Sequence, residues 1–319
     1  MSFSPPFTAA HWPIGAALLQ FPGVRPDGSA VQDAPAAEWA RVFAEVAAAG
    51  FDHVDLTDSW LRPGDLEPAR RDELARALKE SGLGVTAISV VRRSVIDPDP
   101  EVAAANVAYL ERTIDAAAEL GITVVCVGLH RPLTPAQRDA LWFWTEPGAQ
   151  DPMGDERTWQ LCADRLRALG RRAAGHGVAL SLEMYEDTYL GTAESSVALL
   201  DTIGLDNVGL NPDIGNIVRL HRPIEDWERA LAVMLPRANY WHVKNYHRDF
   251  DPATGAYFSV PAPMEQGVIS YRRALDLALD AGFCGHICVE HYGGDGLSVS
   301  ARNRDYLREL LAVKLEARR

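Results

Sequence analysis

The chain has 319 residues, 47% of them hydrophobic, which is enough for one large domain or two ordinary ones with a sizeable core. Its 31 basic and 44 acidic residues give a formal net charge of -13, which argues against a nucleic-acid partner because phosphate backbones would be repelled. No stretch approaches the roughly 18 continuous apolar residues of a membrane span, so we expect no membrane partner.

The N-terminal segment and the cysteines indicate the compartment. The segment "MSFSPPFTAAHWPIG" has no basic region followed by an apolar one, so we expect no secretory signal. The four cysteines lack paired C-x-x-C spacing and lie mostly in apolar runs, as expected for buried thiols in a reducing environment; they are Cys126, Cys162, Cys284 and Cys288. The sequence therefore predicts a cytoplasmic protein.

Short β-rich runs alternate with longer amphipathic runs along the whole chain. The predicted strands are Ile14–Leu19, His53–Leu56, Val85–Val90, Thr123–Val127, Val178–Met184, Val208–Asn211, Tyr240–Val243 and Ile287–Glu290. In the runs between them apolar residues recur every three or four positions, and several runs end in glycine, which is typical of helices. The predicted helical stretches are 36–50, 70–82, 106–121, 158–177, 223–236 and 270–283.

Eight strand–helix alternations without a break in composition predict one parallel α/β domain over residues 1–319, closed as a (β/α)8 barrel, the TIM-barrel architecture. A doubly wound open sheet is the alternative, but no G-x-G-x-x-G follows the first strand. Extended loops follow the fourth strand, at 130–156, and the seventh strand, at 246–267. Both lie on the carboxyl side of the strands, where a barrel builds its active site.

The tips of the last four predicted strands carry potential metal ligands. The runs "LSLEMY", "GLNPDIGN", "YWHVKNY" and "CVEHY" offer Glu183, Asp213, His242 and Glu290, and in a barrel these tips converge. Three neighbouring carboxylates repel one another unless a cation or a shifted pKa relieves the repulsion. We therefore predict a divalent-metal site, although each residue by itself is equally consistent with a helix cap or a partner for arginine. Three oxygen ligands, one imidazole and no thiolate favour Mn2+, with Mg2+, Co2+ or Zn2+ as alternatives.

Strand alternation supports this arrangement. Cys288 lies on the same strand face as Glu290, and Tyr240 and Lys244 lie on the same face as His242. We expect this face to point into the barrel. The residues of the opposite face should point toward the surrounding helices; they include Leu182, Ile287 and Val289.

The motifs "LSLE", "NPDIGN", "WHVKN" and "CVEHY", all within residues 178–292, resemble those of the xylose-isomerase-like barrels, which include sugar isomerases, ketose epimerases and hydroxypyruvate isomerases. In that family the four strand-end residues hold one divalent metal. The resemblance implies that Glu183 and Glu290 also form the proton-transfer pair, whereas Asp213 and His242 act as ligands only. A metal that binds adjacent carbonyl and hydroxyl oxygens acidifies the C–H bond between them, so one glutamate can remove the proton and the other can return one.

The chain departs from the family pattern around the expected substrate. Asn216 stands where the family often has a histidine, and Asn245 where it often has an aspartate, whereas Arg248 matches a substrate-contacting arginine of the epimerase branch. We expect an intact metal site with an altered set of substrate contacts. The candidates for substrate binding are Asn216, Lys244, Arg248, Trp142 and Trp144.

Other candidates lie in the extended loop after the fourth strand. His130 ends that strand and is a candidate second acid or base, with a structural histidine as the alternative. The tryptophans of "WFWTEP" are candidates for stacking on a sugar ring or a bulky aglycone. A core plug over the barrel rim or a subunit contact is the alternative for this aromatic group.

These observations predict a metal-dependent sugar isomerase or epimerase that acts on a small carbohydrate or glycoside. A lyase that releases an aglycone from a 3-keto glycoside by β-elimination, such as a C-glycoside deglycosidase subunit, is the second hypothesis, and a non-catalytic sugar-binding protein is the third. A DNA-repair endonuclease shares the barrel, but the acidic charge argues against it. We expect a homo-oligomer, with or without a small partner subunit.

Overall fold

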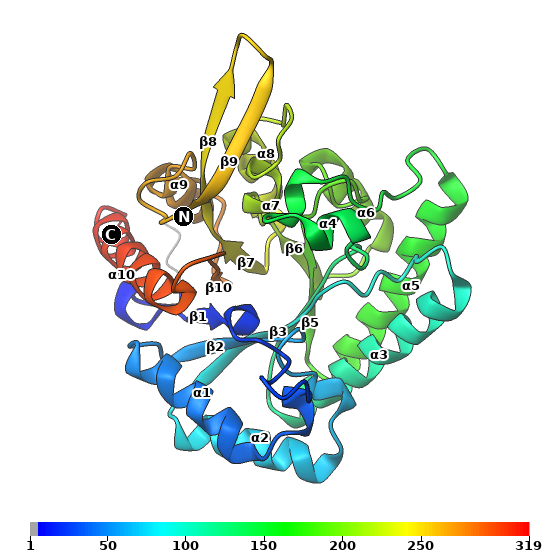
Figure 1. Ribbon diagram of the computed structural model, residues 1–319, viewed down its shortest axis with the longest axis vertical. Coiled ribbons are helices and arrows are strands. Elements are labelled where there is room, and N and C mark those ends of the chain that lie inside the picture. Colours follow the sequence, from blue (N-terminus) through cyan, green and yellow to red (C-terminus); the bar gives the residue numbers. More distant parts are fainter. Residues whose placement is uncertain (1–5, 319) are drawn as a thin grey trace.

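In the computed structural model residues 6–318 are described, and their strands form a nearly closed barrel with the helices outside it (Figure 1). The eight parallel strands of this part of the chain follow one another in the order β6-β5-β4-β3-β2-β1-β10-β7. Their bounds are β1 Ile14–Ala17, β2 His53–Thr57, β3 Gly84–Val90, β4 Val124–Val127, β5 Ala179–Glu183, β6 Val208–Asn211, β7 Tyr240–Val243 and β10 His286–Val289. The predicted (β/α)8 fold is confirmed. The first strand is shorter than predicted because a 3-10 turn over Leu18–Gln20 follows it.

Strands β6 and β7 are the two ends of the sheet and meet at a seam. In the described residues one bridge joins them, between Leu210 and Ala238, and the Asn239 amide donates to the Leu210 carbonyl at 3.2 Å. One residue further along β6, the side-chain oxygen of Asn211 accepts from the His242 amide at 2.7 Å. At the seam a side-chain oxygen thus accepts a backbone hydrogen bond of the kind that a backbone carbonyl accepts between the other strands.

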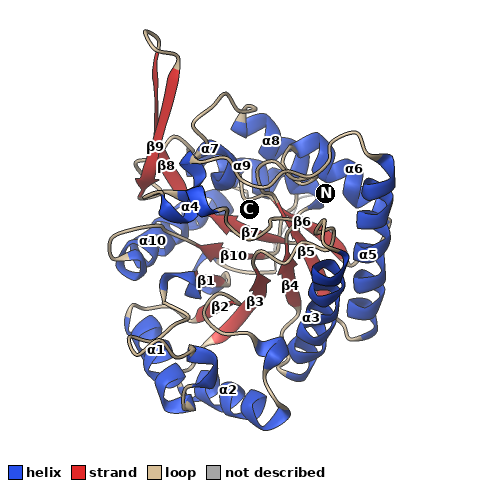
Figure 2. Cartoon of the chain, turned by 45° about the vertical axis from the view of Figure 1, so that its right-hand side comes forward, coloured by secondary structure: helices blue, strands red, loops and turns tan. Residues whose placement is uncertain are grey.

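Helices cover the outer face of the barrel, as Figure 2 shows. The long ones are α1 Ala36–Ala48, α2 Pro68–Glu80, α3 Pro100–Glu119, α5 Glu156–Gly175, α6 Ala193–Ile203, α8 Trp227–Met234, α9 Tyr271–Asp280 and α10 Gly296–Glu316. Many begin at a side chain that accepts from the first turn, such as Asp155 before α5 and Ser270 before α9. Among the described residues no helix is long and apolar enough to cross a membrane.

The two strand faces pack as predicted. Leu182, Ile287 and Val289 belong to the main core between strands and helices. Tyr240 and Cys288 belong to a smaller buried cluster of the opposite face, together with Cys126. Three of the four cysteines are buried, and Cys284 is exposed.

The two extended loops have structure of their own. The loop after β4 contains α4 Pro135–Asp139, which begins with a capping box at Thr134, and a 3-10 turn over Phe143–Thr145. The loop after β7 forms an antiparallel hairpin, β8 Asn245–Asp251 and β9 Ala256–Ala262, which projects away from the barrel (Figure 1). Sequence analysis does not predict this hairpin. A short helix, α7 Gly215–Val218, follows β6.

Candidate active site

The four predicted metal ligands meet at the carboxyl ends of β5, β6, β7 and β10. Each offers one ligand atom, and these atoms all lie within 4.8 Å of one another. The four side chains are buried, with 0% to 6% of their surface exposed. We call this group the ligand cluster; it consists of Glu183, Asp213, His242 and Glu290.

The ring of His242 is oriented by hydrogen bonds from the other side of the barrel. Its Nδ1 lies 3.1 Å from Glu290 Oε1 and 3.5 Å from Glu183 Oε1. Its Nε2 lies 3.2 Å from the hydroxyl of Ser89, which donates to the carboxylate of Asp55 at 2.6 Å. This chain leaves Nδ1 as the nitrogen that faces the ligand cluster.

Two atoms of the ligand cluster fit a bound cation. Asp213 Oδ1 and His242 Nδ1 are buried and have no hydrogen-bond partner within the described chain. Burying a polar atom without a partner is costly. A divalent cation would satisfy both atoms, and three carboxylates with one imidazole suit such an ion. The residues present therefore fit the predicted metal.

Lys244 lies inside this group of charges. Its ammonium contacts Asp213 Oδ2 and lies 2.5 Å from Glu290 Oε2. Burial favours a lower pKa for Lys244, but the charges of Asp213 and Glu290 outweigh it and raise the pKa well above its usual value. The lysine thus compensates the charge of one oxygen on each of these two carboxylates.

Asn216 also contacts the ligand cluster directly. Its amide donates to Glu183 Oε1 at 3.1 Å and to Asp213 Oδ2 at 3.0 Å. It donates as well to the carbonyl of Met184 at 2.9 Å. The predicted substrate-binding residues Asn216 and Lys244 are therefore placed together with the predicted ligands.

Glu183, at the end of β5, and Asp213, two residues after β6, are predicted ligands whose pKa values shift in opposite directions. Burial favours a raised pKa for Glu183, but the close contact with His242 and the charge of that ring lower the pKa well below its usual value. Burial raises the pKa of Asp213 to about 7, against the opposing effect of Lys244. A cation in the cluster would lower the pKa of Asp213, because it favours the charged form.

His130 lies beside the ligand cluster, and its ring is stacked on a neighbouring aromatic ring. Its imidazole packs on Tyr185, with ring centroids 4.4 Å apart and an interplanar angle of 22°. Burial lowers the pKa of His130 to about 3, so the ring is neutral at neutral pH. A Cβ at Gly128 would lie 2.4 Å from Nδ1 of this ring, so the position of the histidine requires glycine there.

The predicted aromatic group covers the rim of the barrel. Trp142 and Trp144 stack with ring centroids 5.0 Å apart, and Trp144 also packs against Tyr246 and Tyr292. Trp142 occupies space that a side chain at Gly293 would fill, since a Cβ there would lie 2.7 Å from the indole. Trp144 lines a cavity of about 270 Å3, which His130 and Tyr185 also line.

Arg248 and Asn245 anchor the hairpin. The guanidinium of Arg248 donates to the carbonyls of Val218, at 3.0 Å, and of Leu220 and Arg222. The amide of Asn245 donates to the carbonyls at 264 and 269. Among the described contacts neither side chain touches the ligand cluster, so the structure does not bring these two candidates together with the others.

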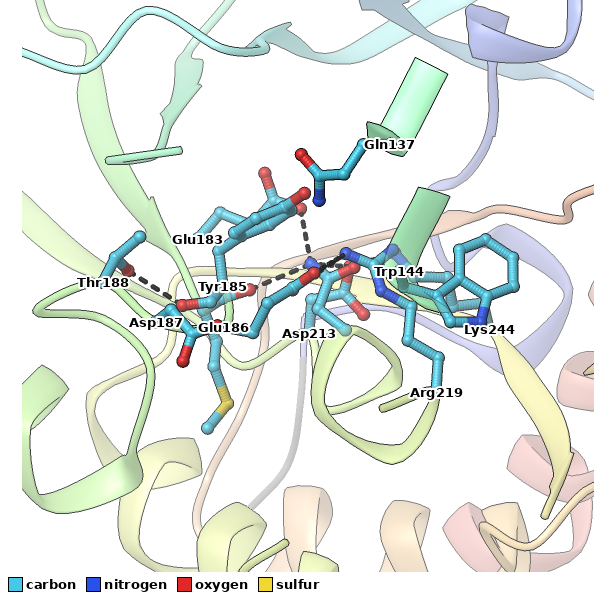
Figure 3. Close-up of polar contacts among 12 residues, drawn as sticks. Gln137, Trp144, Glu183, Tyr185, Glu186, Asp187, Thr188, Asp213, Arg219 and Lys244 are labelled. Carbon is cyan, nitrogen blue, oxygen red and sulfur yellow. Dashed lines mark hydrogen bonds and ion pairs between the residues drawn. The ribbon is translucent and has the colours of Figure 1, made fainter. Parts of the chain in front are cut away.

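Sequence analysis did not identify several residues around the cluster. Arg219 is fully buried, pairs with Glu186 at 2.9 Å and lies beside Trp144, as Figure 3 shows. Arg92 follows β3 by two residues, and Tyr185 follows β5 by two. Extending the inspection of strand tips to β3, and two residues beyond each strand, would have found Arg92 and Tyr185.

Comparisons with known proteins agree with the barrel fold. A family model described as "Xylose isomerase-like TIM barrel" matches residues 43–313. The L-ribulose-5-phosphate 3-epimerase UlaE of Escherichia coli is 23% identical over 273 residues, covering 82% of this chain and 86% of the relative.

Two solved structures resemble the chain to different degrees. A xylose isomerase-like TIM barrel protein from Mycobacterium smegmatis, in complex with magnesium, is 44% identical, with a TM-score of 0.92 over 97% of this chain and 99% of that chain. The 3-keto-D-glucoside 4-epimerase YcjR of Escherichia coli is 18% identical, with a TM-score of 0.65 over 93% of this chain and 99% of the other. This second likeness shows the fold alone.

Proposed function

Because the chain belongs to the xylose isomerase-like TIM barrel family, we propose that it is a metal-dependent sugar isomerase or epimerase that moves a proton next to a carbonyl of a sugar or keto-sugar. The observation that carries the proposal is the arrangement of Glu183 and Glu290. They come from two different strands, and both have an oxygen within 3.5 Å of His242 Nδ1. Two carboxylates around one chelating centre can serve as base and acid in turn.

Each residue of the ligand cluster has a proposed role. Glu183, Asp213, His242 and Glu290 would hold the cation, which when bound supplies the Lewis acid that acidifies the C–H bond of the substrate. The lowered pKa of Glu183 keeps this group ionised, as a metal-binding carboxylate must be. Lys244 holds the Glu290 carboxylate in place, and Asn216 holds that of Glu183. His130, which is neutral and lies beside the ligand cluster, would relay a proton or hold it in position.

The cation is proposed to be a hard divalent ion. The imidazole of His242 among three carboxylates favours Mn2+, and the 44% identical protein from Mycobacterium smegmatis forms a complex with magnesium. Stripping the protein with a chelator and measuring uptake of Mn2+, Mg2+, Co2+ and Zn2+ by calorimetry tests the site. Failure to take up any of them would remove the four-ligand proposal.

Proton exchange tests the reaction directly. We expect the metal-loaded protein to introduce deuterium from D2O into a ketopentose or ketohexose, or to form its epimer, and we expect Glu290→Gln to abolish both changes. The matched control is Glu101→Gln on the exposed start of α3. A panel of ketoses and ketose phosphates on which wild type and Glu290→Gln both equal buffer would contradict the proposal.

A lyase acting on a 3-keto glycoside is the second candidate. The observation that favours it is the cavity of about 270 Å3 beside His130, which has Trp144 in its wall and can hold an aromatic aglycone. Incubation with a 3-keto glycoside should then release the aglycone. Sugar binding without exchange or release would instead support a non-catalytic binding protein. The homo-oligomeric state and the cytoplasmic location stay predictions, for light scattering and cell fractionation to test.

A further inference from the structure

The cavity next to the ligand cluster has an unusual set of charges for so acidic a chain. Its walls come from the ends of β3, β4 and β5, from the extended loop after β4 and from the segment after α7. We call it the arginine pocket. The charged residues of its wall are Arg92, Arg131, Arg222, Glu146, Glu186 and Asp187. His130, Tyr185 and Trp144 also line it. Tyr185 and His130 connect the pocket to Glu183, which lies two residues before Tyr185 and whose charge acts on His130.

Arg92 is held in place at some conformational cost. Its backbone has a φ of 57°, a left-handed conformation that arginine seldom adopts. Its guanidinium donates to the carbonyl of Arg131 at 3.0 Å and to the hydroxyl of Tyr185 at 3.2 Å, and lies 5.0 Å from the ring centroid of Phe143. These contacts fix the direction of a half-buried cation at the wall of the pocket.

The acidic residues of the pocket do not neutralise this cation. Glu186 is paired with buried Arg219, and Asp187 is paired with Arg222 at 2.7 Å. Within residues 6–318 neither Arg92 nor Arg131 forms an ion pair with a carboxylate. Glu146, the remaining acidic residue of the wall, is exposed. Two guanidinium groups therefore line one cavity without a carboxylate partner among the described residues, in a chain whose net charge is -13.

We propose that the arginine pocket binds a phosphate or carboxylate group of the substrate, so that the substrate is an anionic sugar. The inference rests on the proposed function, because the other end of the same substrate would extend past His130 to the ligand cluster. Guanidinium groups recognise both phosphate and carboxylate through paired, charge-assisted hydrogen bonds. A separate arginine site also keeps the anionic group from competing with the carbonyl end for the cation in the ligand cluster.

Binding measurements test the pocket without relying on turnover. We compare D-ribose 5-phosphate, D-ribonate and uncharged D-ribose by isothermal titration calorimetry against the metal-loaded protein. We expect at least one charged sugar to bind about 10-fold or more tightly than ribose. Arg92→Gln and Arg131→Gln should each weaken that binding by about 10- to 100-fold, which is the usual effect of removing one charged hydrogen-bond partner. Arg157→Gln, on the exposed first turn of α5, is the matched control and should change binding less than about 2-fold.

The outcomes separate the two proposals. Tighter binding of the phosphate than of ribonate identifies a phosphate subsite, and the reverse identifies a carboxylate subsite. Anion binding that depends on Arg92 and Arg131, with no exchange on any ketose, supports the pocket and contradicts the proposed reaction. Exchange on uncharged ketoses with equal binding of all three sugars, or loss of binding in neither arginine variant, overturns the pocket alone. Arg131→Gln changes a loop residue with one carbonyl contact, so it decides the matter if Arg92→Gln does not fold.

Discussion

The ligand cluster and the arginine pocket lie side by side at the same end of the barrel, but they are built differently. The cluster consists of side chains at or within two residues of strand ends, buried and bonded mainly to one another. The cations of the pocket come from loops, remain partly exposed and are held by carbonyls such as that of Gln150, which accepts from Arg131. Sheet register fixes the positions of the first group, whereas local loop contacts fix those of the second.

This difference predicts how strongly each region responds to change. Charges in the buried cluster act on one another through a poorly screened environment. The partly exposed charges of the pocket are screened by water and salt. Substitutions in the cluster should therefore have larger effects than substitutions in the pocket, and of a different kind.

The largest effect is expected for Glu183, which we propose both binds the metal and transfers a proton. Glu183→Gln should lower kcat by about 10²- to 10⁴-fold, the range for loss of a general acid or base. Arg131→Gln should instead raise KM for an anionic substrate while leaving kcat nearly unchanged. Steady-state kinetics on one substrate would measure both. Equal changes in kcat for the two variants would remove the distinction between the regions.

Lys244→Met tests the charge balance of the cluster. Removing the ammonium leaves Asp213 and Glu290 buried beside each other, so we expect the metal-free protein to lose about 3–5 kcal/mol of unfolding free energy. Saturating Mn2+ should recover part of this loss, because the cation supplies positive charge. Urea unfolding with and without metal measures the difference. Lys79→Met, an exposed lysine of α2, is the control and should be nearly neutral.

The contacts behind His242 should have an intermediate effect. Ser89→Ala removes the hydroxyl that links His242 Nε2 to Asp55, so we expect about 10-fold weaker metal binding, or somewhat more. Ser181→Ala is the matched control, since that buried hydroxyl has no hydrogen-bond partner among the described residues. Competition with a chelator of known affinity would compare the two. Equal affinities for both variants would mean that the hydroxyl does not orient the ring.

The smallest effect is expected for the exposed acid of the pocket. Glu146→Gln should tighten binding of the preferred anionic sugar by about 2- to 5-fold at low salt, the scale of exposed charge pairs. Raising NaCl to about 0.5 M should remove the gain, because the charges are then screened. Calorimetry at two salt concentrations measures this. A gain that persists at high salt would indicate a direct contact instead.

The same contrast explains which features were predictable from sequence. Strand alternation and tip position predicted that the four residues of the ligand cluster would lie together, because a parallel sheet brings equivalent positions together. Alternation also placed Leu182 on the outward face, where it packs in the main core. Nothing in the pattern of residues signals that Arg92 adopts a left-handed conformation. The assignment of Arg248 to the substrate came from the resemblance, but its position in space depends on a hairpin that the strand pattern did not reveal.

The seam between β6 and β7 gives the ligand cluster a mechanical consequence. Among the described residues, β6 and β7 are joined by one bridge and are the least extensively paired neighbours of the barrel. Asp213 follows β6 and His242 lies on β7, so the two residues stand on opposite sides of the seam. An ion bound by both residues would connect the two strands across the seam and so complete the closure of the barrel. Local opening of the seam should therefore become rarer when the metal is bound. Amide hydrogen exchange in residues 208–211 and 240–243 would show this as stronger protection in the metal-loaded protein than in the metal-free protein.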